Sequence, residues 1–219
     1  MTATLLSRST SAPWLALLLA ALATVMPAPS RAAEPVAGTD YVEIADGKRL
    51  GPADGKIEVV EVFGYWCHHC ANFEPMLERW KQQQGKDVRV SYLPLPRNPD
   101  DMLAVAYFAA DSIHALARTH AATFKGIHDS RELPANPTLD ELTAFYAGLG
   151  VDKNRFRAAA SAPATLARIE PARDFALAMG VEGTPTLIVN GRYRVLGRTL
   201  EDNLRIASAL VERERAAGR

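Results

Sequence analysis

Apolar positions repeat with two different periods along the chain, and the clearest stretch begins at residues 57–63. This run is β-branched and aromatic and hardly alternates with polar residues, which predicts a strand buried on both faces. Residues 67–84 change to a helical period, with apolar residues at i, i+3, i+4 and i+7: Phe73, Met76, Leu77 and Trp80. Pro75 lies inside this predicted helix and should kink it. Residues 88–93 follow as a strand parallel to the first, through a helical crossover.

Residues 98–163 carry helical patterns and contain no candidate strand. Asn98-Pro99-Asp100 is expected to start the first of these helices. Thr138-Leu139-Asp140-Glu141 has the form of a capping box, and Asp152 is placed to cap the helix that comes next. We therefore predict a helical segment inserted between strands.

The C-terminal part of the chain returns to mixed patterns. Residues 164–179 predict a helix bent at Pro171. Asn190-Gly191 is a strong hairpin signal between two short strands. Thr199 is expected to cap a last helix, and residues 41–44 could add an edge strand early in the chain. The predicted hairpin strands are residues 186–189 and 193–196.

The two cysteines of the chain, Cys67 and Cys70, stand where the buried strand gives way to the helix. Residues at i and i+3 in the first turn share a face, so their sulfurs can close a Cys67–Cys70 disulfide with little backbone movement. Free N–H groups and the helix dipole favour a thiolate there. We expect Cys67 to be the exposed nucleophile and Cys70 the resolving cysteine. Since closing so short a loop gains little chain entropy, a redox site is favoured over a structural disulfide.

Two motifs carry a resemblance to a known family. Cys67-His68-His69-Cys70, with Glu61 six residues before it, and the downstream Gly183-Thr184-Pro185-Thr186 resemble the DsbA family of bacterial periplasmic thiol oxidases, within the thioredoxin superfamily. The commoner dipeptide between the cysteines is Pro-His, where this chain has His-His. Thr before the downstream proline also occurs in the isomerase branch of the superfamily.

The resemblance implies an α/β, thioredoxin-like fold with an inserted all-helical subdomain. The predicted parts are a signal peptide at 1–32, the first part of the thioredoxin-like domain at 33–97, the helical insertion at 98–163 and the second part at 164–219.

A targeting segment is expected at residues 1–32. Arg8 precedes an apolar run at residues 14–26, and Ser30-Arg31-Ala32 fits a signal peptidase site, so the mature chain should begin at Ala33. An uncleaved anchor is the alternative, although the run is shorter than the roughly 20 apolar residues of a membrane span. Export leads to the periplasm, an oxidising compartment.

Composition excludes other classes of protein. The 219 residues are 48% hydrophobic and 23% charged, which is ordinary for a globular protein. Basic and acidic residues number 25 each, so neither a nucleic-acid partner nor a charge-steered one is indicated.

A metal site is the second alternative for the cysteine motif, because Cys and His are common ligands. Four consecutive residues on a helix point in directions about 100° apart, so they cannot converge on one ion. No metal and no cofactor are therefore predicted. His114, His120 and His128 show no ligand spacing and are interpreted as solvated surface residues.

Other residues receive roles from the family positions. Glu61 could face solvent at a strand edge, but the resemblance implies a partly buried acid that exchanges protons with the cysteines, its pKa raised by desolvation. His69 holds the family's histidine position, and His68 or His69 as imidazolium would lower the pKa of Cys67. The resemblance also implies a cis Thr184–Pro185 bond that exposes backbone to substrate, beside which Trp66 would line an apolar groove.

The predicted function is a periplasmic thiol:disulfide oxidoreductase that donates its disulfide to exported, folding proteins with free thiols. The resemblance implies reoxidation by a membrane quinone-linked partner. A disulfide isomerase or reductase is the nearest alternative, and a metal-binding chaperone is a more distant one. The 187 residues after Ala32 suffice for one domain with its insertion and leave no room for a dimerisation domain, so a monomer is expected.

Overall fold

The computed structural model describes residues 1–4 and 34–218, and the folded unit begins at Glu34. The predicted targeting segment, beyond its first four residues, lies outside the described part of the chain. The strands are β1 Tyr41–Glu43, β2 Ile57–Phe63, β3 Val88–Pro94, β4 Thr186–Val189 and β5 Tyr193–Val195. The helices are α1 His68–Gln82, α2 Met102–Ser112, α3 Leu116–His128, α4 Leu139–Gly148, α5 Lys153–Ala160, α6 Pro163–Leu166, α7 Ile169–Ala178 and α8 Leu200–Ala216.

The strands form one mixed sheet in the order β1-β5-β4-β2-β3. Strand β2 pairs parallel with β3 and antiparallel with β4, and all seven of its residues are buried. This confirms the predicted buried strand and its parallel neighbour. The Asn190-Gly191 hairpin is also present, with Arg192 N–H donating to the Val189 carbonyl and both turn residues at positive φ, as a type I′ turn requires.

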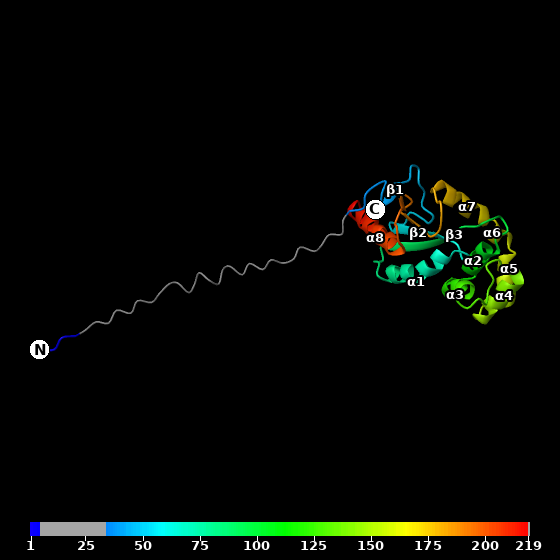
Figure 1. The fold of residues 1–219 in the computed structure, drawn as a ribbon, viewed down its shortest axis with the longest axis horizontal. Helices are drawn as coiled ribbons and strands as arrows, with labels where there is room; N and C mark the ends of the chain where they lie inside the picture. The colour runs from blue at the N-terminus through cyan, green and yellow to red at the C-terminus, as the bar shows by residue number, and fades with distance from the viewer. Residues whose placement is uncertain (5–33, 219) are drawn as a thin grey trace. The chain divides into compact units, whose positions relative to one another are not determined.

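Helices cover both faces of the sheet (Figure 1). On one face, Ile57 and Val59 of β2 pack with apolar residues of α1 and α8, including Phe73, Leu77, Ile206 and Leu210. On the other face, Val60 and Val62 pack in a core that takes in α2 and α7. The two faces of β2 therefore belong to different cores, as the two-residue period of a strand requires.

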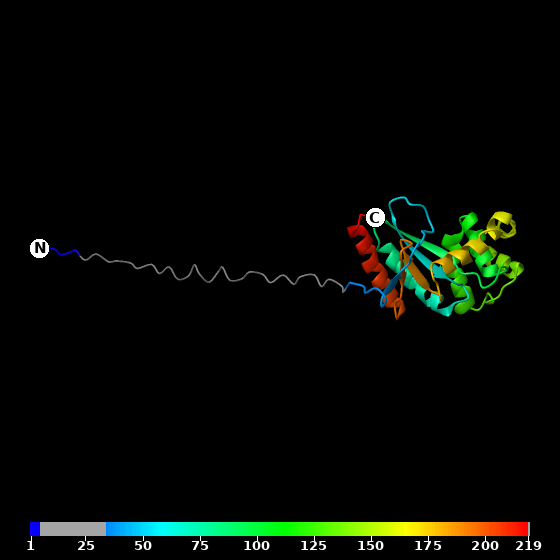
Figure 2. The same cartoon turned by 90° about the horizontal axis from the view of Figure 1, so that it is seen from above.

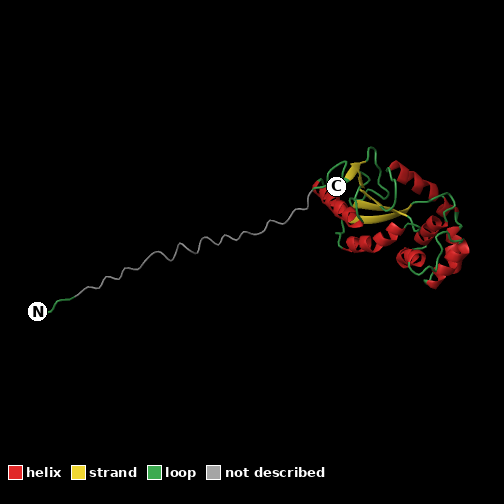
Figure 3. Ribbon diagram, in the orientation of Figure 1, coloured by secondary structure: helices red, strands yellow, loops and turns green. Residues whose placement is uncertain are grey.

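The helices inserted between β3 and β4 gather on the side of the sheet away from α8 (Figures 1 and 2). Figure 3 shows this all-helical group beside the strands, which confirms the predicted fold class. The capping box at Thr138 is formed, and Asp152 caps α5 through the Arg155 N–H. Among the described residues, no helix combines the length and the apolarity that membrane crossing demands.

Two helix boundaries differ from the prediction. The first inserted helix begins at Met102, because Asp101 is its N-cap and accepts from the Leu103 N–H. Residues 164–179 form two helices, α6 and α7, rather than one helix bent at Pro171. Pro171 is the third residue of α7, where a backbone N–H would have no helical partner in any case. The interruption between the two helices lies instead at residues 167–168, the C-cap of α6 and the N-cap of α7.

Candidate active site

The turn that joins β2 to α1 places the first cysteine. Cys67 N–H donates to the Gly64 carbonyl at 2.9 Å, which closes a tight turn over Tyr65 and Trp66. A Cβ on Gly64 would stand 2.5 Å from the Trp66 ring, so glycine lets this ring fold back over the turn. Cys67 is then the N-cap of α1, and its Sγ accepts from the Cys70 N–H at 3.3 Å. A sulfur thus takes the position that a serine or aspartate oxygen usually holds.

The two cysteines are free thiols in very different environments. The pKa of Cys67 is lowered to about 5, first by a hydrogen bond from the Cys70 thiol and further by the Thr184 side chain and the backbone N–H groups of Cys70 and His69, against the opposing effect of burial. Burial is the main cause that raises the pKa of Cys70, and the neighbouring Cys67 and Glu61 add to it. Cys67 is therefore a thiolate at neutral pH, while Cys70 keeps its proton.

Cys67 is less open than the sequence suggested. It is 7% exposed and Cys70 is not exposed at all, so the expected difference holds in direction but Cys67 is mostly covered. Thr184 provides part of the cover, since its carbonyl oxygen lies 3.3 Å from Cys67 Sγ. The Thr184–Pro185 peptide bond is cis, as the resemblance implied. Thr184 and Pro185 are both partly exposed beside the sulfur.

Glu61 lies inside the protein and not at a solvent-facing strand edge. Its side chain is 1% exposed, and neither carboxylate oxygen has a hydrogen-bond partner. Burial is the largest cause that raises the pKa of Glu61 well above its usual range, followed by the nearby carboxylate of Glu74 and by Cys67. Its strand neighbour Tyr92 lines a pocket of about 660 Å³ together with Glu74 and His120. The buried Glu61 is thus separated from a solvent-accessible pocket by its strand neighbour Tyr92.

The two histidines between the cysteines are exposed. The His68 Nε2 accepts from the Asn72 side-chain amide at 3.2 Å, and the two imidazole centroids are 6.2 Å apart. The backbone N–H of His69 is one of the causes that lower the pKa of Cys67. Trp66 is partly buried, with its ring against Gly64 and no partner for its indole N–H.

Sequence reasoning missed two histidines of α3. His120 contacts the Tyr65 hydroxyl through Nδ1 at 2.9 Å, and burial lowers its pKa to about 3, so it is neutral and not a solvated surface residue. His128 Nε2 lies 2.8 Å from the Tyr65 carbonyl oxygen. Only His114 is exposed as expected. The spacing of His120, Phe124 and His128 at i, i+4 and i+8 was an available signal, because it places all three on one helix face.

Within the described residues, no three His, Cys, Asp or Glu side chains are grouped so that they could hold a metal ion. The chemistry that the geometry offers is that of the dithiol. It combines a thiolate at a helix N-terminus, a buried thiol one turn deeper and a buried, unpaired acid beneath them.

Comparison with known proteins gives concordant results. A family model described as thioredoxin matches residues 45–206. The chain is 34% identical over 203 residues to the thiol:disulfide interchange protein DsbA of Pseudomonas aeruginosa, covering 91% of this chain and 95% of that protein. It is 33% identical to the protein of the same name from Azotobacter vinelandii, over 82% and 85% of the two chains. The crystal structure of the oxidoreductase DsbA from Xylella fastidiosa superposes with a TM-score of 0.80 at 48% identity, covering 83% of this chain and 98% of that one.

Proposed function

The chain belongs to the DsbA family of thiol:disulfide interchange proteins, and we propose that it is a periplasmic oxidase that transfers a Cys67–Cys70 disulfide to exported proteins. One observation supports this direction of transfer above the others. The pKa of Cys67 is lowered to about 5, so its thiolate is a stable product and a good leaving group. When the reduced form is stabilised in this way, the disulfide is easily reduced and therefore oxidises substrate thiols readily.

The first step begins from the oxidised protein. A substrate thiolate attacks Cys67 Sγ, a mixed disulfide forms, and the Cys67–Cys70 bond breaks. The electron pair of that bond leaves on the sulfur of Cys70. Because the pKa of Cys70 is raised by burial and by Glu61, this sulfur takes up a proton at once.

The second step releases the product. A second substrate thiolate attacks the substrate sulfur of the mixed disulfide, and Cys67 leaves as a thiolate. Two substrate thiols have then become one disulfide, and two electrons have passed to the enzyme. One of the two protons stays on Cys70 and the other enters solvent, since Cys67 remains ionised at neutral pH.

Glu61 is assigned the proton transfer to and from Cys70. Burial raises the pKa of Glu61 well above its usual range, so this carboxyl keeps its proton to a higher pH than an exposed glutamate does, and no hydrogen bond holds that proton in place. Protonated Glu61 can supply Cys70 as it leaves and recover the proton when the disulfide is remade. The pocket beside Tyr92 gives water a way to reset the acid.

Substrate is proposed to lie along Thr184 and Pro185, with Trp66 beside it. Thr184 is partly exposed and its carbonyl is already 3.3 Å from the reactive sulfur. An extended peptide added at this edge would carry its own cysteine to Cys67. His68 and His69 are exposed next to the sulfur and complete the proposed rim of the site.

The remaining features of the proposal follow the family resemblance. The protein is exported and cleaved after Ala32, acts as a monomer on folding proteins with free thiols, and is reoxidised by a membrane quinone-linked partner. We propose the same division into parts 33–97, 98–163 and 164–219 as the sequence predicts. The intact mass of the protein isolated from the periplasm tests the cleavage, because a mass that retains residues 14–26 indicates an anchored protein.

The test of the function is a single-turnover oxidation. Oxidised enzyme is mixed with a reduced, unfolded protein, and free thiols are counted against time. We expect one substrate disulfide for each wild-type enzyme molecule and none for Cys67→Ser or Cys70→Ser, which have no disulfide to donate. Reduced Cys70→Ser should instead accumulate a mixed disulfide when it is given a disulfide-containing protein, because Cys67 displaces one sulfur of that disulfide and no Cys70 thiol remains to resolve the product. An enzyme that reduces insulin readily but leaves the thiols of the unfolded protein unchanged would be a reductase instead.

A further inference from the structure

His128 joins the helical insertion to the turn that carries the active-site cysteine. It is the last residue of α3, and its Nε2 lies 2.8 Å from the carbonyl oxygen of Tyr65, which stands 63 residues earlier in the chain. A carbonyl oxygen only accepts, so Nε2 must carry the proton of this hydrogen bond. The interaction fixes the tautomer of the neutral imidazole and persists in the imidazolium form, where both nitrogens donate.

Tyr65 is held at both of its ends by the same helix. Its hydroxyl meets His120 Nδ1 at 2.9 Å, and its carbonyl meets His128. The two histidines are eight residues apart, about two helical turns, and so project from one face of α3. Tyr65 is only 1% exposed, and a buried carbonyl without a partner is costly. His128 therefore supplies the hydrogen-bond donor for the Tyr65 carbonyl that the turn itself does not provide.

The turn that His128 holds leads directly to Cys67. Tyr65 and Trp66 are the central residues of the turn closed by Cys67 N–H and the Gly64 carbonyl. The sulfur then makes two contacts of 3.3 Å each, with the Cys70 N–H and with the Thr184 carbonyl. Hydrogen bonds weaken steeply when their angles depart from linear, so a small rotation of the turn weakens the contact that stabilises the thiolate.

We propose that His128 is a positioning residue for thiol exchange, which fixes the turn at Tyr65 and through it the N-cap geometry of Cys67. It touches neither reacting sulfur. The role rests on the proposed function for its meaning, because a positioned thiolate matters only if Cys67 takes part in exchange. In this way the helical insertion takes a direct part in setting the reactivity of the cysteine.

A second explanation must be separated from this one. The His128 ring lies 5.8 Å from that of His68 beside the cysteines, so a protonated His128 would add positive charge near the thiolate. Glutamine and asparagine both abolish that charge, and both offer an amide N–H. Only glutamine places its nitrogen at about the reach of Nε2, whereas asparagine ends one methylene short of the Tyr65 carbonyl.

The experiment compares His128→Gln with His128→Asn in the reduced protein by titrating the thiolate absorbance of Cys67. We expect the pKa of Cys67 to stay within about 0.2 units of wild type in the glutamine variant and to rise by about 0.5–1 unit in the asparagine variant, in keeping with the loss of one ordinary hydrogen bond from the supporting turn. His114→Asn is the control, because His114 is exposed and its φ of 58° suits asparagine.

Each remaining outcome overturns the inference. Equal shifts in the glutamine and asparagine variants would assign the effect to charge, and no shift in either would make His128 a structural residue only. Circular dichroism of both variants checks that the fold is kept. A wild-type Cys67 that titrates near an ordinary thiol would instead contradict the proposed function, independently of how the variants behave.

Discussion

Two glutamates on strand β2 share residue type, strand and burial, yet they have opposite surroundings. Glu58 near the start of the strand is fully buried, and Glu61 near its end is 1% exposed. Their separation of three residues places them on opposite faces of the sheet. Glu61 lies on the face covered by α1 and α8, and Glu58 lies on the other face.

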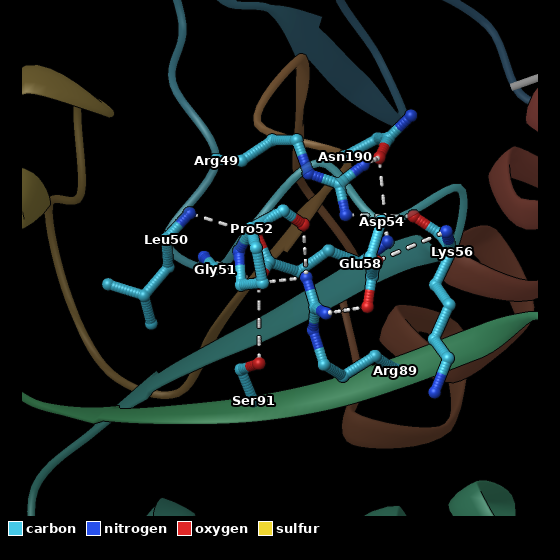
Figure 4. Close-up of polar contacts among 10 residues, drawn as sticks. All are labelled: Arg49, Leu50, Gly51, Pro52, Asp54, Lys56, Glu58, Arg89, Ser91 and Asn190. Carbon is cyan, nitrogen blue, oxygen red and sulfur yellow. Dashed lines mark hydrogen bonds and ion pairs between the residues drawn. The ribbon is translucent and has the colours of Figure 1, made fainter.

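The Glu58 carboxylate is satisfied by four residues from two parts of the chain (Figure 4). It accepts from the backbone N–H groups of Leu50 and Gly51 at 2.8 Å each, from Arg89 at 3.3 Å and from Ser91 at 3.4 Å. Asp54 and the Pro52 carbonyl hold the same Arg89 guanidinium. The carboxylate therefore fastens the loop after β1 onto the sheet, and its role is structural.

Glu61 has no such partners, and this difference has a chemical meaning. Both oxygens of the Glu58 carboxylate are occupied by hydrogen bonds from the loop. A buried carboxyl without them remains protonated at higher pH and can give the proton up. The proposal thus assigns an anchoring role to the glutamate at one end of the strand and proton transfer to the glutamate at the other end, and the following experiments test that assignment.

The largest effect is expected at the anchoring end. Glu58→Ala should lower the free energy of unfolding by about 3 kcal/mol, because two partly buried N–H groups lose their acceptor and the Arg89 guanidinium loses its buried carboxylate partner. The pKa of Cys67 should not change. Denaturant unfolding beside a thiolate titration measures both quantities. Glu43→Ala, which alters an exposed edge-strand glutamate, is the control. A loss no larger than that of the control would mean that the loop is held by other contacts.

The next effect concerns the thiolate at the reactive end. The folded-state pKa of Cys67 is depressed to about 5, below an unfolded value near 9, so its stabilisation is fully present above the unfolded pKa and is lost as pH falls through about 5. Between pH 7 and a pH well below 5 this amounts to about 2.7 kcal/mol, since pH 7 lies two units above the folded-state pKa and each unit corresponds to about 1.36 kcal/mol. Cys70 keeps its proton throughout and adds nothing over this range.

The oxidised protein has no thiolate and serves as the reference for this effect. We expect the reduced form to be the more stable at pH 7 and to lose about 2–3 kcal/mol relative to the oxidised form on acidification below pH 5. Paired denaturant melts of the two forms at both pH values measure this difference. An oxidised protein that melts clearly higher at neutral pH would contradict an oxidase and favour a reductase.

Glu61→Gln should slow thiol exchange on the order of tenfold at neutral pH. General acid–base catalysis typically contributes about 10²–10⁴ in rate, and water takes over part of that contribution in the variant. Stopped-flow oxidation of a reduced substrate measures the rate. The raised pKa of Glu61 gives a second expectation, for the stability of the protein. Its stability contribution is fully present below the unfolded pKa and is lost as pH rises through the folded pKa.

The glutamine variant should consequently match wild type near pH 4 and become the more stable of the two as pH rises. Thermal melts across that range follow the change. An unchanged exchange rate together with unchanged melting at every pH would remove Glu61 from the proposed proton transfer.

The smallest effect is expected for Ser91→Ala. Its hydroxyl reaches Glu58 at 3.4 Å, which is long for a hydrogen bond, and the two loop N–H groups remain. The variant should lose no more than about 0.5 kcal/mol of unfolding free energy, the lower end for one hydrogen bond. A loss comparable to that of Glu58→Ala would show that the network around Glu58 acts cooperatively, in a way that its individual distances do not indicate.

Much of the fold and the position of the dithiol could be predicted from the sequence alone. The buried strand, the cysteines at the start of the next helix, the Asn190-Gly191 turn and the cap at Thr138 all came from residues within a few positions of one another. Such features depend on period, capping and turn chemistry, which are local. The one helix predicted over residues 164–179 was wrong because a proline in a first turn and a proline inside a helix have the same local sequence.

The tertiary structure alone decided which polar residues are reactive. Glu58 and Glu61 are both acids in one apolar strand. Their surroundings differ because Leu50, Gly51 and Arg89 donate hydrogen bonds to Glu58. The histidines of the insertion divide in the same way, since His128 reaches a carbonyl 63 residues away while His114 remains exposed. The physical reason is that desolvation and hydrogen bonding set the pKa and the role of a side chain, and in a folded chain the groups responsible are mostly distant in sequence.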